Sequence, residues 1–585
     1  MKSDILKRRL RGAVDVTAYK SDAPSFCCAI SGHTILSIVK PRTLLSFQNF
    51  VGWTVVAPRM GDVQQASSVS GDDTKEYVIV QEGKAKIGFH GPVFYNPVQE
   101  FNRDLTVSVL RQFVKSRAQG EATTSKANGT PVSPIAKKQK LDFDIEDKPI
   151  RILDALSASG LRALRFFHEV ENVDFILAND FSENAVESIK ENIILNGAEG
   201  KVRAKFGDAV MTMMEHRSID KRFHAVDLDP YGSASVFLDS AVQCVADRGI
   251  LMVTCTDMAV LCGNTPETCY NKYGSTTVRL KCCHEMALRI LLRSIDSHAN
   301  RYSRYIEPLI SISVDFYVRV FVRLYTGARL TKESGTKVGN VIACSGCHSM
   351  EVMPILRKVE DGKSLKYCSS VVRQSIMDSN NKCIHCGHSL HHAGPIYTGP
   401  IHNRQFVEGV LASLKETPAE ERLGTHNRLL GVLTNVAEEL DEPLYYEHDQ
   451  LFNVVKCCVP KAVSVRSAIL NAGYKVSGSH CNPRALKTNA PVDFLWDICR
   501  LAAKEANVTA DRHDQKAPGH KILSEPIKNE INFQLHPGAI IQTKNDQMVR
   551  FQCNKGKNWG PRSKAKGSVN STLAGFYSKV PEPVQ

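Results

Sequence analysis

The chain has 585 residues, enough for two to four folded units. Apolar residues make up 43% and charged residues 23%, which excludes collagen-like, mucin-like and wholly disordered chains. No apolar run approaches the roughly 18 residues of a membrane span, so we exclude a membrane partner, and the net charge of +13 permits a polyanionic partner without requiring one.

Residues 1–75 form an N-terminal extension in our division of the chain. Residues 1–60 contain nine basic residues and three acids, which is typical of a mitochondrial transit peptide and equally of a disordered extension. A polar stretch at 115–149 predicts a flexible insert, and its lysines 137, 138 and 140 weakly resemble a nuclear import signal. Because the 18 cysteines are too sparse for a disulfide scaffold, we expect an intracellular protein of the nucleus, the mitochondrion or the cytosol.

Residues 76–330 predict one α/β domain. It opens with a β-like stretch at 76–87 and a helix-compatible stretch at 107–114. Short apolar runs that alternate with helical stretches then predict five parallel strands of a doubly wound, Rossmann-like sheet. These runs are residues 150–155, 173–178, 202–206, 223–228 and 250–254. After a long helix near 278–297, the runs 309–314 and 317–324 predict an antiparallel pair at the far edge of the sheet.

Residues 331–568 predict a smaller α+β C-terminal domain, followed by a tail at 569–585. The domain contains two CxxC pairs and helical stretches at 404–414, 427–440 and 463–472. The pairs Cys344/Cys347 and Cys383/Cys386 supply four thiolates, the ligand set of a structural, tetrahedral zinc site. The alternative is four reduced cysteines in a core.

Polar residues follow three consecutive predicted strands, at the sheet edge where open parallel sheets bind ligands. Gly160 lies in a turn of small residues, Asp180 is placed to accept ribose hydroxyls, and Asp208 with Ala209 is suited to an adenine edge. Without a glycine-rich diphosphate loop, this set favours S-adenosylmethionine as the cofactor. The alternative is that Asp180 and Asp208 only cap helices.

The fourth strand ends in Asp229-Pro230-Tyr231, which resembles the loop of amino-group methyltransferases. An exocyclic amine is a poor nucleophile until acceptors hold its N–H bonds. Asp229 and the Pro230 carbonyl supply acceptors, Tyr231 supplies a stacking surface, and in-line positioning supplies most of the catalysis. The alternative is that the string is only a tight turn.

These strings together resemble the family of tRNA guanosine-26 N2,N2-dimethyltransferases. The resemblance covers roughly residues 76–567 and rests on residues 94–97, 102–104, 153–166, 179–180, 207–209, 227–233, 256–263 and 394–400. It implies methyl transfer, twice, from S-adenosylmethionine to the N2 amine of guanosine 26 in tRNA. It also implies that Arg103, Arg162, Asp180, Asp208 and Ala209 bind the cofactor. Many relatives carry phenylalanine at Tyr231, which preserves stacking.

Two basic stretches predict contacts with tRNA. Residues 544–566 interleave seven basic residues with Phe551 and Trp559, and residues 466–487 form a second basic stretch that ends at Lys487. A solvated basic surface is the alternative for the first.

The sequence therefore predicts a tRNA methyltransferase with no obligate protein partner. Two other functions stay open: the same amine chemistry on rRNA, DNA or protein, and a non-catalytic zinc-ribbon RNA-binding protein with a vestigial cofactor site.

Overall fold

The computed structural model describes residues 77–90, 95–118, 149–362, 364–372, 375–540 and 548–552. The chain divides into two units, Met1–Pro58 and Arg59–Gln585, and every described residue belongs to the second. The N-terminal extension, residues 119–148 of the predicted insert, residues 553–568 of the predicted C-terminal domain and the tail at 569–585 lie outside the described residues. In the described part of the chain, no helix is both long and apolar enough to cross a membrane.

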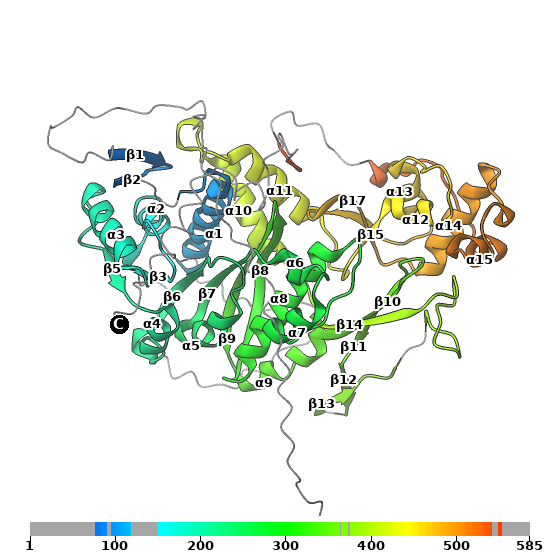
Figure 1. Cartoon of the computed structure of the whole chain (residues 1–585), viewed down its shortest axis with the longest axis horizontal. Coiled ribbons are helices and arrows are strands. Elements are labelled where there is room, and N and C mark those ends of the chain that lie inside the picture. Colours follow the sequence, from blue (N-terminus) through cyan, green and yellow to red (C-terminus); the bar gives the residue numbers. More distant parts are fainter. Residues whose placement is uncertain are drawn as a thin grey trace, which may run out of the picture. The chain divides into compact units, whose positions relative to one another are not determined.

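A seven-stranded sheet organises the first half of the fold (Figure 1), in the order β5-β4-β3-β6-β7-β9-β8. Its strands are β3 (Ile150–Asp154), β4 (Val173–Asp180), β5 (Val202–Phe206), β6 (Phe223–Leu228), β7 (Val245–Cys255), β8 (Arg304–Val314) and β9 (Tyr317–Thr326). The first five are parallel, whereas β9 runs antiparallel to both β7 and β8. The predicted sheet is confirmed, including its antiparallel edge. Because the chain leaves β3 towards β4 but leaves β6 towards β7, the switch point lies between β3 and β6.

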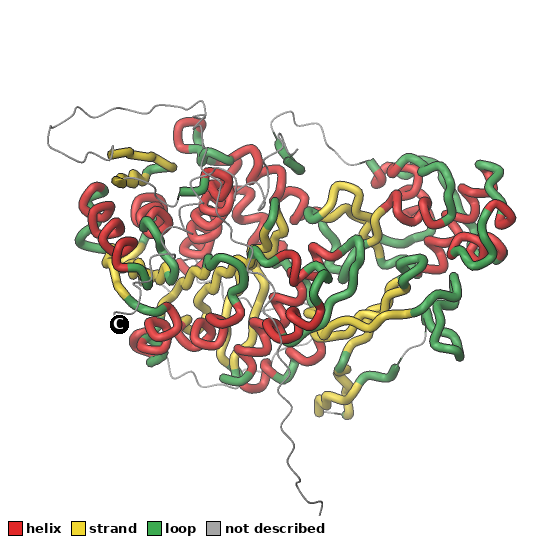
Figure 2. The backbone as a smooth tube through the Cα atoms, in the orientation of Figure 1, coloured by secondary structure: helices red, strands yellow, loops and turns green. Residues whose placement is uncertain are grey.

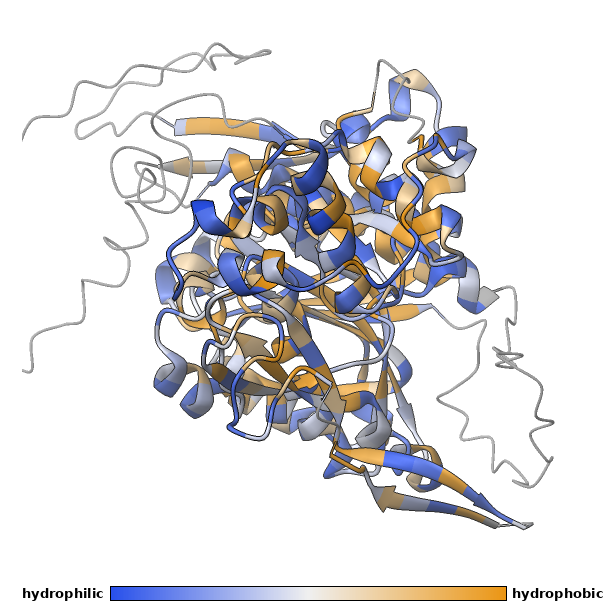
Figure 3. Ribbon diagram, turned by 90° about the vertical axis from the view of Figure 1, so that its right-hand side faces the viewer, coloured by the Kyte–Doolittle hydropathy of each residue, from blue (hydrophilic) through white to orange (hydrophobic). Residues whose placement is uncertain are grey.

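Alternation along each strand builds a core on both faces of the sheet. On one face, Leu153 and Val226 join a core with helices α4, α5 and α8; on the other, Ile152 and Ala225 join a core with α1, α2 and α3. The helices are α1 (Glu100–Ala118), α2 (Leu161–Glu169), α3 (Glu183–Leu195), α4 (Ala209–Glu215), α5 (Leu238–Cys244) and α8 (Cys283–Asn300). In Figure 3 the apolar residues gather in the strands and on inward helix faces. Since α1 continues to Ala118, residues 115–118 are helical and not part of a loop as predicted.

A hairpin and two later helices complete the second face. The hairpin is β1 (Tyr77–Glu82) with β2 (Ala85–His90), and the helices are α10 (Arg404–Glu416) and α11 (His426–Glu438). Apolar residues of α10 and α11 share one core with α1, although our division of the chain placed them in the C-terminal domain.

The remaining elements mix strands and helices (Figure 2), as expected for an α+β arrangement. Strands β10 (Val338–Cys344), β11 (Met350–Pro354) and β14 (Leu390–Tyr397) form one sheet, and β12 (Leu356–Asp361) pairs with β13 (Ser364–Ser369). A third sheet joins β15 (Tyr446–Glu447), β16 (Val476–Ser479) and β17 (Asn482–Thr488). The helices are α9 (Ala328–Thr331), α12 (His448–Val454), α13 (Ala462–Asn471), α14 (Val492–Glu505) and α15 (Pro518–Ser524). The four CxxC cysteines and Trp496 belong to the core of this part.

Candidate active site and tetrathiolate cluster

Three neighbouring strand ends are tied together by one side chain. The Asn179 Nδ2 donates to the carbonyls of Ala155 and Gly207, at 3.0 Å each. Gly160, with φ of +79°, precedes the first residue of α2 and lets the chain turn from β3 into that helix. The ends of β3, β4 and β5 thus form one continuous edge.

Asp180 ends β4 with its carboxylate held by the backbone. Its Oδ2 accepts from the Ala158 N–H at 2.9 Å and its Oδ1 from the Ser182 N–H at 3.0 Å. Burial raises the pKa of Asp180, and hydrogen bonds from the backbone of Ser182, Ala158 and Phe181 work against that rise. The cap of α3 is Ser182, whose hydroxyl accepts from the Ala185 N–H. Asp180 is therefore not the helix cap, and each of its oxygens keeps acceptor capacity for a ligand.

Asp208 does cap a helix. Its Oδ1 accepts from the Met211 N–H at 2.9 Å at the start of α4, and Ala209 is the buried first residue of that helix. The capping alternative is confirmed for Asp208. Its adenine role stays a prediction, since the cap occupies one oxygen of an exposed carboxylate.

Arg103 is bound within its own neighbourhood. Its Nε donates to Glu82 at 2.6 Å, and its Nη2 donates to the Asn96 carbonyl at 3.0 Å. Glu82 also accepts from Arg165 at 2.8 Å, so the carboxylate on β1 holds two buried guanidinium groups. None of these bonds joins Arg103 to the other residues predicted to bind the cofactor.

Arg162 joins the predicted cofactor edge to the predicted catalytic loop. Its Nη2 forms an ion pair with Asp229, and its Nη1 lies 3.3 Å from Asp227 Oδ2. Nη1 also donates to Asn102 and Thr106, at 3.2 and 3.3 Å. One nearly buried guanidinium thus contacts Asp227 in β6, Asp229 in the loop after β6, and two polar side chains of helix α1.

A second arginine completes a buried charge cluster. Arg319 of β9 donates to both oxygens of Asp227, at 3.1 and 2.9 Å, and to Thr254 at 2.6 Å. Sequence reasoning missed Asp227 and Arg319. The available signals were two arginines, Arg319 and Arg323, within a mainly apolar strand and an acid two residues before Asp229.

Within the charge cluster, the pKa values of Asp154 and Asp229 are shifted in opposite directions. Burial, and then the charge of Asp227, raises the pKa of Asp154 to about 7. Burial also pulls the pKa of Asp229 upwards, but Arg162 and Arg319 outweigh it and leave that pKa below its ordinary value. Asp229 is therefore an ionised acceptor at neutral pH.

The three residues of the loop after β6 differ in their exposure to solvent. The Asp229 side chain is 21% exposed, Pro230 is buried, and Tyr231 is 55% exposed. A carboxylate and an accessible aromatic ring therefore lie two residues apart in the sequence, directly after β6 and beside the switch point. That arrangement can hold a planar, hydrogen-bonding ligand.

Comparison with known proteins assigns the chain to a family. Residues 74–500 match the family of N2,N2-dimethylguanosine tRNA methyltransferases. The chain belongs to this family. It is 67% identical over 511 residues to the tRNA (guanine(26)-N(2))-dimethyltransferase of Caenorhabditis elegans, covering 87% of this chain and 97% of the relative.

Other members of the dimethyltransferase family extend the likeness. A relative from Saccharomyces cerevisiae, named as the mitochondrial enzyme, is 35% identical over 84% of this chain and 93% of its own. The structure of Trm1 from Pyrococcus horikoshii with S-adenosyl-L-methionine is 29% identical, with a TM-score of 0.56 over 72% of this chain and 98% of that chain.

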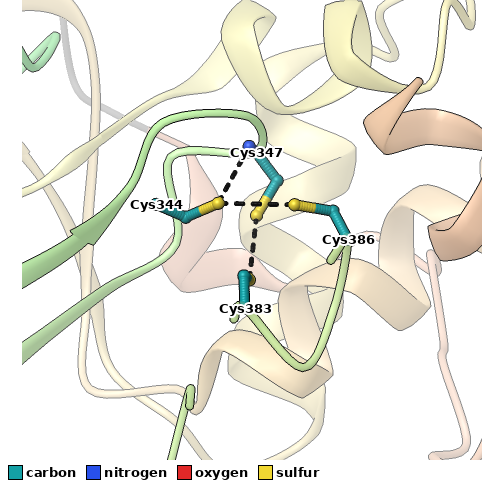
Figure 4. Close-up of side chains that lie close together, drawn as sticks. All are labelled: Cys344, Cys347, Cys383 and Cys386. Atoms are coloured by element: carbon teal, nitrogen blue, oxygen red, sulfur yellow. Dashed lines mark hydrogen bonds between the residues drawn. The ribbon is translucent and has the colours of Figure 1, made fainter. Parts of the chain in front are cut away.

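This dimethyltransferase also brings its two CxxC pairs together (Figure 4). The Sγ atoms of Cys344 and Cys386 lie 3.3 Å apart, and those of Cys347 and Cys383 lie 3.6 Å apart. Bonds of about 2.3 Å to a tetrahedral zinc place sulfur atoms about 3.8 Å apart, so the cluster is close to that size. The N–H groups of Gly346 and Cys347 point at Cys344 Sγ, at 3.3 and 3.5 Å, as they would at a thiolate.

Of the two stretches predicted to contact tRNA, one includes a buried lysine and the other is described only in part. Lys487 is fully buried, with its Nζ 3.0 Å from Glu285 and 2.8 Å from Glu439, so its prediction as a surface contact is wrong. In the basic stretch at 544–566, Arg550 pairs with Glu438 at 2.6 Å. Residues 544–547 and 553–566 of that stretch lie outside the described part of the chain.

Proposed function

We propose that this protein transfers two methyl groups from S-adenosylmethionine to the N2 amine of guanosine 26 in tRNA. The observation that carries the proposal is the ionised Asp229, beside an exposed Tyr231, at the switch point of the sheet. The family to which the chain belongs supports it, as does the Caenorhabditis elegans relative, which is named for this reaction and matches over 97% of its own length.

The donor side of the site is assigned to the ends of β3, β4 and β5. Asp180 receives hydrogen bonds from the ribose hydroxyls, using the acceptor capacity that its backbone bonds leave open. Asp208 accepts from the adenine amine with its second oxygen, and Ala209 lets the ring approach the start of α4. S-Adenosylmethionine supplies a methyl group activated on a sulfonium.

The acceptor side of the site is assigned to the loop after β6. Asp229 and the Pro230 carbonyl accept the two N–H bonds of the guanine N2 amine, which turns its lone pair towards the donor. Tyr231 stacks on the extruded base, a contact of roughly 1–3 kcal/mol. The end of β6 lies two strands from the end of β4, about 10 Å away. A donor bound at the end of β4 can therefore place its methyl group between these two strand ends.

Arg162 serves both sides of the site in this proposal. The family resemblance assigns it to the donor, and it pairs with Asp229 and Asp227 in the present structure. A donor carboxylate that draws Arg162 towards itself loosens the pair with Asp229, and this carboxylate then becomes available to the amine. We therefore expect the donor to bind before the guanosine. Arg103 would have to exchange its bonds to Glu82 in the same way.

The tetrathiolate cluster is assigned to a structural zinc ion. Four thiolate ligands leave no open position for catalysis, and the cluster lies in the core beside Trp496. Zinc binding would therefore stabilise the C-terminal part of the fold and leave the methyl transfer itself to the sheet edge.

The experiment that tests the proposed reaction is methylation of a tRNA transcript by the full chain, with nucleoside mass spectrometry. We expect N2,N2-dimethylguanosine with the natural transcript and no product when guanosine 26 is changed to adenosine. Asp229→Ala should keep donor and tRNA binding and lose methyl transfer. Undiminished methylation by that variant would remove the assigned role of the loop, and product on the adenosine-26 transcript would refute the position.

The compartment is proposed as intracellular, with import into mitochondria as the finer assignment. The basic composition of residues 1–60 and the name of the yeast relative support import. Cell fractionation of the full chain, against a form lacking residues 1–75, tests it: both forms in the same compartment would contradict a transit peptide.

A further inference from the structure

The Asp229–Ser233 loop is held in place by the segment of chain that follows β7. The Gly232 N–H donates to Thr256 Oγ1 at 2.7 Å, and the Thr256 N–H donates to the Gly232 carbonyl at 2.8 Å. Gly232 has φ of +78°, a left-handed conformation that suits glycine, so the loop can turn back to make both bonds. The loop is therefore held by a neighbouring segment as well as by its own strand.

A tyrosine hydroxyl provides a third attachment. Tyr273 is the last residue of α7 (Pro266–Tyr273), and its side chain is turned into the protein so that only 2% of the residue is exposed. Ser233 Oγ donates to the Tyr273 hydroxyl at 2.7 Å, and this hydroxyl donates to Asp257 Oδ1 at 2.8 Å. Asp257 is in turn paired with Lys272 at 3.2 Å.

The direction of these bonds fixes the orientation of the Ser233 hydroxyl group. Because its hydroxyl hydrogen is given to Tyr273, its oxygen remains free to accept the Ser235 N–H at 3.2 Å. This second bond begins the turn into α5, so Ser233 is tied on both sides. A chain of hydrogen bonds thus runs from Asp257 through Tyr273 to the residue that ends the acceptor loop.

We propose that Tyr273 is a positioning residue for methyl transfer, one whose hydroxyl sets the distance and angle of Asp229 and Pro230 to the guanine amine. This inference rests on the proposed function, because it assumes that the loop receives the amine. Tyr273 does not touch the substrate; it acts through Ser233.

The second methylation is the step that depends most on this placement. The unmodified amine has two N–H bonds, which Asp229 and the Pro230 carbonyl can both hold. After one methyl transfer a single N–H remains, so one acceptor alone orients the nitrogen while the new methyl group must be turned aside. A loop that moves by a fraction of an ångström therefore slows the second transfer more than the first.

Tyr273→Phe isolates this role because it removes only the hydroxyl and keeps the buried ring. Three groups lose a partner, and each keeps another. The half-buried Asp257 keeps Lys272 and the half-buried Ser233 keeps the Ser235 N–H, while the buried Cys255 thiol keeps its bond with the backbone of Ala234. Water can replace the missing bond, so we expect the fold to persist.

The test measures the ratio of monomethylated to dimethylated guanosine 26 at equal total conversion of tRNA. This ratio does not change if a variant merely lowers the fraction of folded enzyme. For Tyr273→Phe we expect the ratio to rise about tenfold, as one lost hydrogen bond would allow, with donor affinity within about twofold of the wild type. Ser233→Ala should give the same ratio, and the double variant should be no worse than either single one.

The matched control is Tyr270→Phe, on the same helix but 60% exposed, which should leave the ratio unchanged. Ser233→Thr, which keeps the hydroxyl, should restore the wild-type ratio. An unchanged ratio in folded Tyr273→Phe, whether its overall rate is normal or reduced, would overturn the inference. Asp229→Ala is assayed in parallel: if it remains fully active, the proposed function has failed and not only the role of Tyr273.

Discussion

Replacing Asp229 by asparagine removes a charge from the acceptor loop while it preserves the size of the side chain. Asp229 is ionised because Arg162 and Arg319 outweigh the effect of burial on its pKa. An asparagine offers one neutral acceptor oxygen where the carboxylate offers two charged ones. We therefore expect Asp229→Asn to weaken the hydrogen bond that holds the amine in the transition state.

The structure separates the cost in rate from the cost in stability. Loss of one preorganised charged partner in a site typically raises the barrier by about 2.7–4 kcal/mol, so kcat should fall by about 10² to 10³. Arg162 keeps Asp227 at 3.3 Å, Asn102 at 3.2 Å and Thr106 at 3.3 Å, so it is not left as a lone buried charge. The free energy of unfolding should therefore change by no more than about 1 kcal/mol.

The assay is single-turnover methylation of a tRNA transcript with enzyme in excess, together with calorimetric measurement of donor affinity. We expect a slower chemical step with donor affinity within about threefold of the wild type. A rate within about threefold of wild type in a folded Asp229→Asn protein would refute the reasoning. A loss of rate that follows entirely from lost donor binding would move Asp229 to the donor side.

Three further perturbations test other parts of the account. Because the pKa of Asp154 is raised from 3.8 to about 7, the folded protein holds a proton there that the unfolded chain releases, so stability should fall as pH rises through this window, by up to about 4 kcal/mol. Denaturant unfolding at pH 5 and pH 8 should show a smaller fall for Asp154→Asn, and an equal fall in both proteins would contradict the assignment. Lys487→Met leaves two buried carboxylates without their shared cation and should cost about 3–5 kcal/mol, seen as a lower thermal midpoint than that of the exposed control Lys475→Met. Equal midpoints would show that the buried pair contributes nothing. Metal analysis should find about one zinc per chain and a loss of it in Cys383→Ser; active wild-type protein without zinc would exclude the structural ion.

The strands of the sheet could be predicted because buried parallel strands are short apolar runs, and the helices between them have their own periodicity. The start of β7 was missed for a local reason. Residues 246–249 read Ala-Asp-Arg-Gly, which breaks the apolar run, yet the strand begins at Val245 and Arg248 takes φ of +58°. An irregular strand that contains charges cannot be separated from a loop by pattern alone.

The sequence could predict site residues only where they lie at the carboxyl end of a predicted strand. Asp180 ends β4 and Asp229 follows β6, so both could be predicted as site residues, and their roles stay predictions. Arg319 contacts Asp227 across 92 residues of sequence, and no local pattern predicts that pair. Lys487 failed for the same reason, because its partner Glu285 lies 202 residues away and draws the amine into the interior.

The most direct test of the central claim is a crystal structure of the protein with S-adenosylhomocysteine and a tRNA that contains guanosine 26. The account predicts ribose hydroxyls on Asp180 and the extruded guanine between Tyr231 and the cofactor sulfur, with its N2 amine on Asp229. A guanine that lies away from the end of β6, or a cofactor that does not contact Asp180, would contradict it.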